Sequence, residues 1–163
     1  MRKPEEVVMT GIEAGVPKSF VPSLARLYRP LEPWSYAVLR LAAGAIMMPH
    51  GAQKLFGGAA VAGGKYLAPW GLPATPEWAM GLGILELVGG AMLVLGLLTR
   101  PVALLFAIEL FVVTFVVPQT LGWAWVIKGA TEHYPLTLLV LFLAVFFRGG
   151  GHYSLDRLIG KEF

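Results

Sequence analysis

Three ionisable side chains lie inside long apolar segments of this sequence, and they are the residues best placed to do chemistry. They are Arg40, Glu86 and Glu109. A charge at the centre of a membrane costs roughly 2.5–3.5 kcal/mol on insertion scales, so such residues usually face a partner or a cavity. Counted at about 1.5 Å per residue, Arg40 and Glu109 reach similar depths from the inner face. We therefore predict an Arg40–Glu109 ion pair, with Glu86 either within reach of the arginine or protonated.

Two interpretations of these intramembrane polar groups remain open. In one, a buried ion pair fixes which helices meet. In the other, the groups form a proton relay or the polar wall of a small-molecule site. Ala79, Gly83 and Gly90 share a helix face with Glu86, and small residues let helix backbones approach closely in membranes. The same face would leave room for a flat ring beside the carboxylate.

A second group of polar residues gathers near the predicted outer face. His50, Gln53 and Lys54 end the first apolar segment, and Glu132 and His133 begin the last. The candidate ligand or quinone site comprises His50, Gln53, Glu86, Glu132 and His133, and a histidine titrating near neutral pH there could serve a quinone or a proton exit. Two histidines and a glutamate could also bind zinc or iron. Because no H-x-x-x-H spacing is present, we predict no metal site, and no residue is assigned as catalytic.

The composition indicates a membrane protein. Of 163 residues, 56% are hydrophobic and 14% charged, and the mean hydropathy is +0.68, whereas soluble domains carry about 25% charged residues. The absence of cysteine excludes disulfides, thiolate metal ligands and dithiol redox chemistry. No P-loop or other phosphate-binding motif is present. The basic residues behind the net charge of +3 are scattered, so we predict no nucleic-acid partner.

Four apolar segments are candidates for membrane-spanning helices. They cover about residues 35–56, 78–98, 101–118 and 133–147. Pro101 is best placed at the start of the third helix, since proline is tolerated in a first turn and not in a helix interior. The predicted fold class is therefore all-α: an integral membrane four-helix bundle over residues 34–147.

The distribution of Lys and Arg predicts the orientation of this bundle. Residues 1–33, the turn at Arg100 and the tail 148–163 carry nine Lys and Arg, and the two opposite loops carry three, counting Lys54. The positive-inside rule then places both termini in the cytoplasm. We expect a multi-pass protein of the bacterial plasma (inner) membrane.

The N-terminal extension, residues 1–33, has no apolar core of the kind found in signal peptides. Leu24, Leu27, Tyr28 and Leu31 follow helical spacing. This pattern predicts an amphipathic segment for the cytoplasmic headgroup layer or for a neighbouring subunit.

Short motifs in a fixed order resemble the DoxX family of small bacterial membrane proteins. After Arg40 they are HGxxKLF at 50–56, GGKYLAPWGLP at 63–73, ELVGG at 86–90, GLLTR at 96–100, EHYP at 132–135 and GGGHYSLD at 149–156. The resemblance covers about residues 34–158 and leaves the N-terminal extension outside. It implies a four-helix membrane bundle associated with redox systems, because relatives include a membrane subunit of a thiosulfate:quinone oxidoreductase.

Two kinds of function follow as hypotheses, and whether the chain is an enzyme stays open. In the first, it is the membrane subunit of a redox complex, which anchors a protein partner within the lipid and offers a quinone a site near Glu86 and His50. No other cofactor is identifiable. The alternative is a non-catalytic accessory subunit of a larger membrane assembly, or a small-solute or proton pathway.

Overall fold

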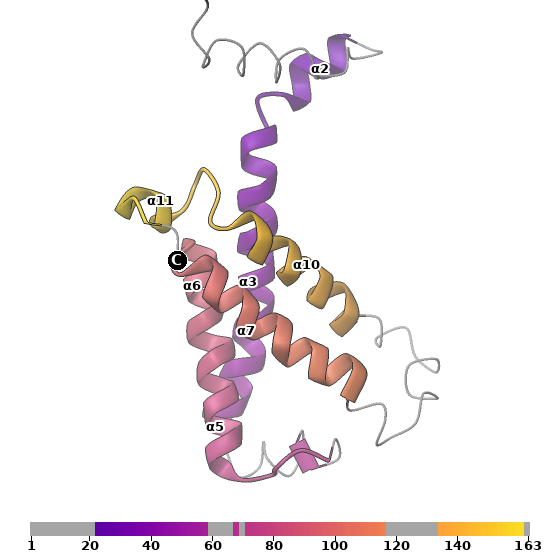
Figure 1. The fold of residues 1–163 in the computed structure, drawn as a ribbon, viewed down its shortest axis with the longest axis vertical. Helices are drawn as coiled ribbons and strands as arrows, with labels where there is room; N and C mark the ends of the chain where they lie inside the picture. Colours follow the sequence, from indigo (N-terminus) through magenta and orange to yellow (C-terminus); the bar gives the residue numbers. More distant parts are fainter. Residues whose placement is uncertain (1–21, 59–66, 69–70, 117–133, 162–163) are drawn as a thin grey trace, which may run out of the picture. The chain divides into compact units, whose positions relative to one another are not determined.

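The described part of the chain is helical throughout. The computed structural model describes residues 22–58, 67–68, 71–116 and 134–161, and no strand occurs among them. The helices are α2 (Pro22–Tyr28), α3 (Glu32–Phe56), α5 (Pro76–Ile84), η3 (Leu85–Gly89), α6 (Gly90–Leu95), α7 (Thr99–Phe111), η4 (Val112–Val116), α10 (Tyr134–Arg148) and α11 (Leu155–Ile159) (Figure 1). η3 and η4 are single π-helical turns. The chain divides into two compact units, Met1–Pro33 and Trp34–Phe163.

In the first unit, the described helix is α2, which has seven residues. Its Leu24, Leu27 and Tyr28 side chains are exposed, as is Leu31 just beyond the helix. These are the four residues that the sequence assigns to an amphipathic segment. Its contact with headgroups or with another subunit stays a prediction.

In the second unit, two continuous helical stretches are long and apolar enough to cross a membrane. They are Pro76–Leu95, built from α5, η3 and α6, and Thr99–Val116, built from α7 and η4. Only 33% of the tested window in each stretch is buried, whereas the core helix of a soluble protein would be mostly buried. α10 is also apolar but has only 15 residues. Pro101 lies in the first turn of α7, where its missing N–H leaves no hydrogen bond unmade.

Large apolar side chains point outward from every long helix. Exposed examples are Val38, Leu41, Ile84, Val88, Leu104, Phe111, Val140 and Phe147. A water-soluble monomer rarely exposes so extensive an apolar surface. Lipid acyl chains are the environment that such a surface fits.

Helix α6 is ended by a glycine, so that the chain turns back into α7. Gly96 has a φ of +71°, and the amides of Gly96 and Leu97 donate to the carbonyls of Leu93 (3.1 Å) and Met92 (2.8 Å). This is the Schellman arrangement, which needs a left-handed residue after the last helical turn. The following Leu98 also has a positive φ, +47°. The two left-handed residues make the turn tight enough for α6 and α7 to pack together.

Helix α3 packs against α5, η3 and α6 through glycines spaced seven residues apart. A Cβ added at Gly44 would lie 2.5 Å from the Gly90 carbonyl oxygen, and one added at Gly51 would lie 2.6 Å from that of Gly83. Because 7 residues is close to two helical turns, the glycines of each helix share one face. The predicted packing of the small-residue face around Glu86 against a neighbouring helix is thereby confirmed.

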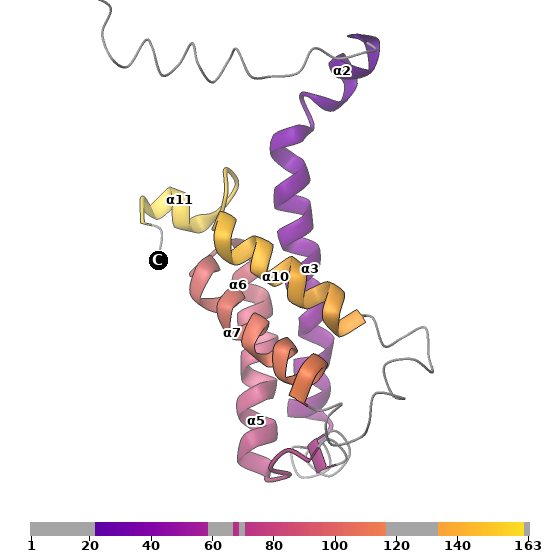
Figure 2. The same cartoon turned by 45° about the vertical axis from the view of Figure 1, so that its right-hand side comes forward.

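Helices α7 and α10 pack closely and cross the α3 and α5–α6 pair at an angle in both views (Figures 1 and 2). Phe106 of α7 and Phe142 of α10 are fully buried, with ring centroids 4.9 Å apart. Ala43, Met47 and Leu93 join them in one core. The helices are therefore tied together at their centre.

Candidate ligand-binding pocket

A pocket of about 590 Å³ opens among the helices, on the side of the core remote from the α6–α7 turn. Its lining comes from the second half of α3, from α5 and η3, from α7 and η4, from the start of α10 and from residues 67 and 72–73. Most of the wall is apolar, with residues such as Met47, Leu67, Trp78, Leu85, Leu105 and Leu138. Pockets with apolar walls and a few converging polar groups are the usual form of a small-molecule site.

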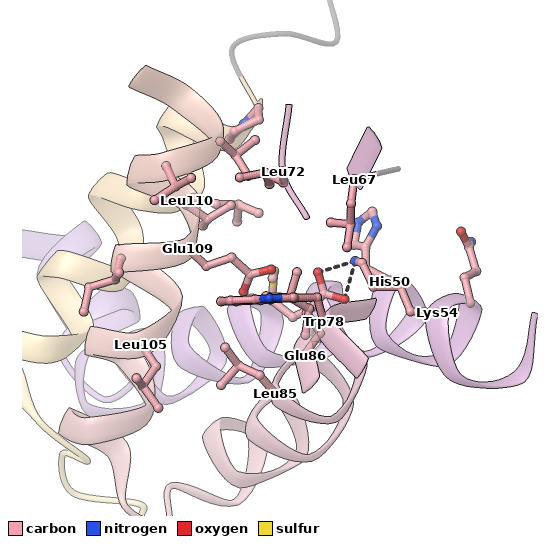
Figure 3. Close-up of a pocket in the computed structure, with 18 of the residues that line it drawn as sticks. His50, Lys54, Leu67, Leu72, Trp78, Leu85, Glu86, Leu105, Glu109 and Leu110 are labelled. Atoms are coloured by element: carbon pink, nitrogen blue, oxygen red, sulfur yellow. Dashed lines mark hydrogen bonds and ion pairs between the residues drawn. The ribbon is translucent and has the colours of Figure 1, made fainter. Parts of the chain in front are cut away.

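An ion pair between Lys54 and Glu86 forms the polar floor of this pocket. The Lys54 ammonium donates to both carboxylate oxygens, at 2.6 Å to Oε1 and 2.5 Å to Oε2 (Figure 3). The side chains are only 12% and 5% exposed. Removing one partner of so buried a pair would leave an isolated charge, which is far more costly than an isolated surface charge.

Glu109 reaches the same place from α7. Figure 3 shows its carboxyl group directed across the pocket toward Glu86, and it interacts electrostatically with both Glu86 and Lys54. Its Oε2 is buried and has no hydrogen-bond partner among the described residues. Two carboxyl groups and one ammonium group thus meet in an apolar wall. Their charges do not balance unless a proton or a ligand joins them.

The backbone around the pocket departs from regular α-helix at two points. η3 is a π-helical turn that contains Glu86, and η4 is a second π-helical turn that follows Glu109. A π turn inserts an extra residue into a helix and re-aims the side chains after it, and such turns are frequent at functional sites. Gly51 and Gly83 bring α3 and α5 close enough for Lys54 to reach Glu86.

Several of the predicted site residues line this pocket. His50, Gln53 and Glu86 do so together, and the His50 ring lies 6.3 Å from the Tyr134 ring between centroids. Glu132 and His133 lie outside the described residues. No group of three or more His, Cys, Asp or Glu with metal-ligand geometry occurs in the part of the chain that the structure describes.

The predicted Arg40–Glu109 ion pair is wrong. Arg40 lies at the level of the α6–α7 turn, where a Cβ on Gly96 would come within 2.5 Å of its Nη1. It donates to the carbonyls of Gly150 and Tyr153, the latter at 2.7 Å. The prediction counted the two depths from Trp34 and Pro101, as if both residues lay at the same level. In the structure α3 extends beyond the α6–α7 turn, so Arg40 lies level with that turn, and Glu109 lies further along α7, at the pocket.

The C-terminal segment that binds Arg40 had no assigned role in the sequence. Asp156 accepts hydrogen bonds from the amides of Leu98 (2.7 Å) and Thr99 (2.9 Å), which open α7, and its own amide donates to the Gly96 carbonyl (3.0 Å). The Tyr36 hydroxyl donates to the Gly149 carbonyl. A carboxylate on the first amides of a helix satisfies donors that have no partner inside the helix and complements its dipole.

Sequence reasoning also missed Lys54 and Glu109 as members of the pocket. The sequence places Lys54 at the end of the first helix, and we counted it with the outer loops for topology, but its pairing with Glu86 was not predicted. A signal was present: Lys54 follows His50 by four residues, which places both on one helix face. The glycine pairs 44/51 and 83/90 have the same seven-residue spacing on the two helices. Pairing these glycines places Glu86 opposite the face that carries His50 and Lys54.

These features define a helical membrane protein that has an apolar pocket with an ion pair at its base. The comparisons with known proteins also indicate a membrane protein. The DoxX family model matches residues 35–119. An uncharacterized membrane protein of Mycobacterium tuberculosis is 30% identical over 152 residues, covering 88% of this chain and 93% of its own length. No solved structure matches the chain. The protein belongs to the DoxX family.

Proposed function

We propose that this protein is a four-helix, multi-pass protein of the bacterial plasma membrane whose pocket binds a lipid-soluble ring compound such as a quinone. It would serve a membrane-associated redox complex as anchoring subunit and ligand site. The observation that carries the proposal is the pocket itself, because an apolar cavity of about 590 Å³ ends on the Lys54–Glu86 pair, the Glu109 carboxyl, His50 and Gln53.

The chemistry of this lining suits an amphipathic ring. Aliphatic walls and Trp78 would hold the ring and its tail, while His50 and Tyr134 could donate to carbonyl oxygens. Hydrogen bonds are strong in such a low-dielectric site. The resemblance to the DoxX family, whose relatives include a membrane subunit of a thiosulfate:quinone oxidoreductase, supports the same ligand class.

In the proposed topology both termini and Arg100 face the cytoplasm, and residues 57–77 and 119–132 lie outside. The nine-to-three distribution of Lys and Arg supports this orientation. Since the chain has no cysteine, single cysteines can be labelled selectively. Leu158→Cys should react with an impermeant maleimide only after the cells are opened, and Lys65→Cys should react in intact cells. The reverse pattern would overturn the orientation.

The ligand proposal is tested with decylubiquinone, oxidised and reduced, added to the purified protein in lipid nanodiscs. Quenching of tryptophan fluorescence should report binding, since Trp78 lines the pocket. Glu86→Gln, which keeps the shape and a hydrogen-bonding group, should retain binding, and Glu86→Leu should weaken it by about tenfold. Glu77→Gln is the matched control, because Glu77 is exposed on the same helical stretch and lies outside this pocket.

Loss of fold must be separated from loss of the ligand, because Glu86→Leu strands the Lys54 ammonium. The double variant Lys54→Met with Glu86→Leu removes that problem. If the double variant folds and binds oxidised and reduced decylubiquinone as tightly as wild type does, the pocket is not a quinone site.

A non-catalytic accessory role is the second candidate. The observation that favours it is the Lys54–Glu86 pair, which joins α3 to η3 and could serve packing alone. Equal assembly, ligand content and activity in wild type, Glu86→Gln and Glu86→Leu would favour this role.

A further inference from the structure

We infer that the pocket selects ligands whose polar head donates a hydrogen bond, such as an aromatic hydroxyl, and that Oε2 of Glu109 is the acceptor. This inference deepens the proposed function and rests on it, since it specifies the head group of the ligand in the same pocket. It predicts that a hydroquinone-type or phenolic head binds better than the same ring with its oxygen blocked.

The argument starts from the hydrogen-bonding capacity of the polar floor. Lys54 already holds both oxygens of Glu86, at 2.5 and 2.6 Å. Glu109 is the other carboxyl group at this floor, and its Oε2 is a buried oxygen without a hydrogen-bond partner among the described residues. A buried polar atom in this state lowers stability unless a partner arrives.

The direction of the missing hydrogen bond follows for either protonation state of Glu109. An ionised carboxylate can only accept. If Glu109 carries a proton, the carboxylate that it faces, Glu86, is the natural acceptor for that proton (Figure 3). Oε2 is then a carbonyl oxygen, which also accepts. The ligand must therefore supply the donor.

The rest of the lining fits a single aromatic ring with an apolar substituent. Leu105 and Ile108 lie one helical turn or less from Glu109 on α7, and Leu85 and Trp78 approach from the opposite wall. A hydroxyl that donates to Oε2 would place its ring against these apolar side chains. A cavity of about 590 Å³ is large enough for a drug-sized molecule.

The test uses 4-octylphenol and 4-octylanisole, which have the same shape except that the second has a methyl group in place of the hydroxyl hydrogen. Binding to the full-length protein in lipid nanodiscs is measured by tryptophan quenching, with partition into empty nanodiscs subtracted. We expect the phenol to bind about tenfold more tightly, as a hydrogen bond to a carboxyl group predicts. Glu109→Leu should abolish that preference while leaving the binding of the methyl ether unchanged.

Glu109→Gln is the conservative variant. Its amide nitrogen can donate to Glu86 and its carbonyl oxygen can take the place of Oε2, so the preference for the phenol should persist. Equal affinities for phenol and ether in wild type, or a preference that survives Glu109→Leu, would overturn the inference and leave the proposed function standing. If neither probe binds and decylubiquinone also fails to bind, the proposed function itself falls, and the inference with it.

Discussion

At the α6–α7 turn, Arg40 donates to two backbone carbonyls and Asp156 accepts from two backbone amides. In the pocket, Lys54 binds Glu86 through side-chain atoms alone, and Glu109 brings a second carboxyl group. Each region leaves buried polar atoms unpaired among the described residues: Arg40 Nε and Thr99 Oγ1 at the turn, and Glu109 Oε2 in the pocket. The two regions differ in what surrounds those atoms.

Around Arg40 the backbone and side chains are closely packed. A Cβ added to Gly150 would lie 2.6 Å from Ser154 Oγ, and one added to Gly96 would meet the guanidinium. Glu109 instead lines a cavity. Buried charges that bind backbone atoms in a packed region hold segments together, whereas an unsatisfied carboxyl beside a cavity lowers stability and gains from a ligand. We therefore expect a structural role for the Arg40 region, and the proposed ligand would bind in the pocket.

The largest effect is expected from Arg40→Leu. This change leaves the carbonyls of Gly150 and Tyr153 without these donors and removes a cation that interacts electrostatically with Asp156. Breaking one side of a buried charge network costs about 3–5 kcal/mol in the free energy of unfolding. Thermal unfolding in mild detergent should show the loss, and limited proteolysis should cut the C-terminal segment first.

Arg157→Leu is the matched control for that experiment. Arg157 is an exposed arginine of the same C-terminal segment, and its replacement should change the free energy of unfolding by no more than about 0.5 kcal/mol. If Arg40→Leu destabilises the protein no more than the control does, the Arg40 region does not hold the helices together, and the structural role expected for it is wrong.

An intermediate effect is expected at the pocket floor. Lys54→Met and Glu86→Leu should each destabilise the protein, because each strands a buried charge. The double variant should recover part of the loss, with a coupling of about 1–3 kcal/mol in a double-mutant cycle. The same cycle on Arg40 and Glu109 should give additive effects, since these residues do not touch. Additivity between Lys54 and Glu86 would contradict the ion pair.

Much of the helical architecture could be predicted from hydropathy and from the positions of proline and glycine. The apolar runs gave the long helices, and Pro101 marked the start of α7 within two residues. The small face around Glu86 correctly indicated a close helix neighbour. These features depend on local sequence, through hydrophobic periodicity and the backbone preferences of proline and glycine.

The charge partners could not be predicted because they depend on helix register. Counting each helix from its own end gives Arg40 and Glu109 similar depths. In the structure α3 extends beyond the α6–α7 turn, which shifts Arg40 to the level of that turn. The backbone carbonyls of residues 150 and 153 carry no sequence signal as ligands of an arginine. The π-helical turn that contains Glu86 likewise follows from packing and has no motif of its own.

The smallest effect on stability is expected from Glu109→Leu. Whether this change raises or lowers the stability is the sharpest test of the difference between the pocket and the Arg40 region. The change removes a buried oxygen that has no hydrogen-bond partner among the described residues and adds apolar surface to an apolar wall. Replacing such a group with a residue of similar volume is commonly neutral or stabilising by about 1 kcal/mol or more. The melting temperature without ligand should therefore stay the same or rise, while the stabilisation that 4-octylphenol gives to wild type should be lost. A clear drop in the ligand-free melting temperature would show that Glu109 is a structural partner of the Lys54–Glu86 pair, and the pocket would then resemble the Arg40 region.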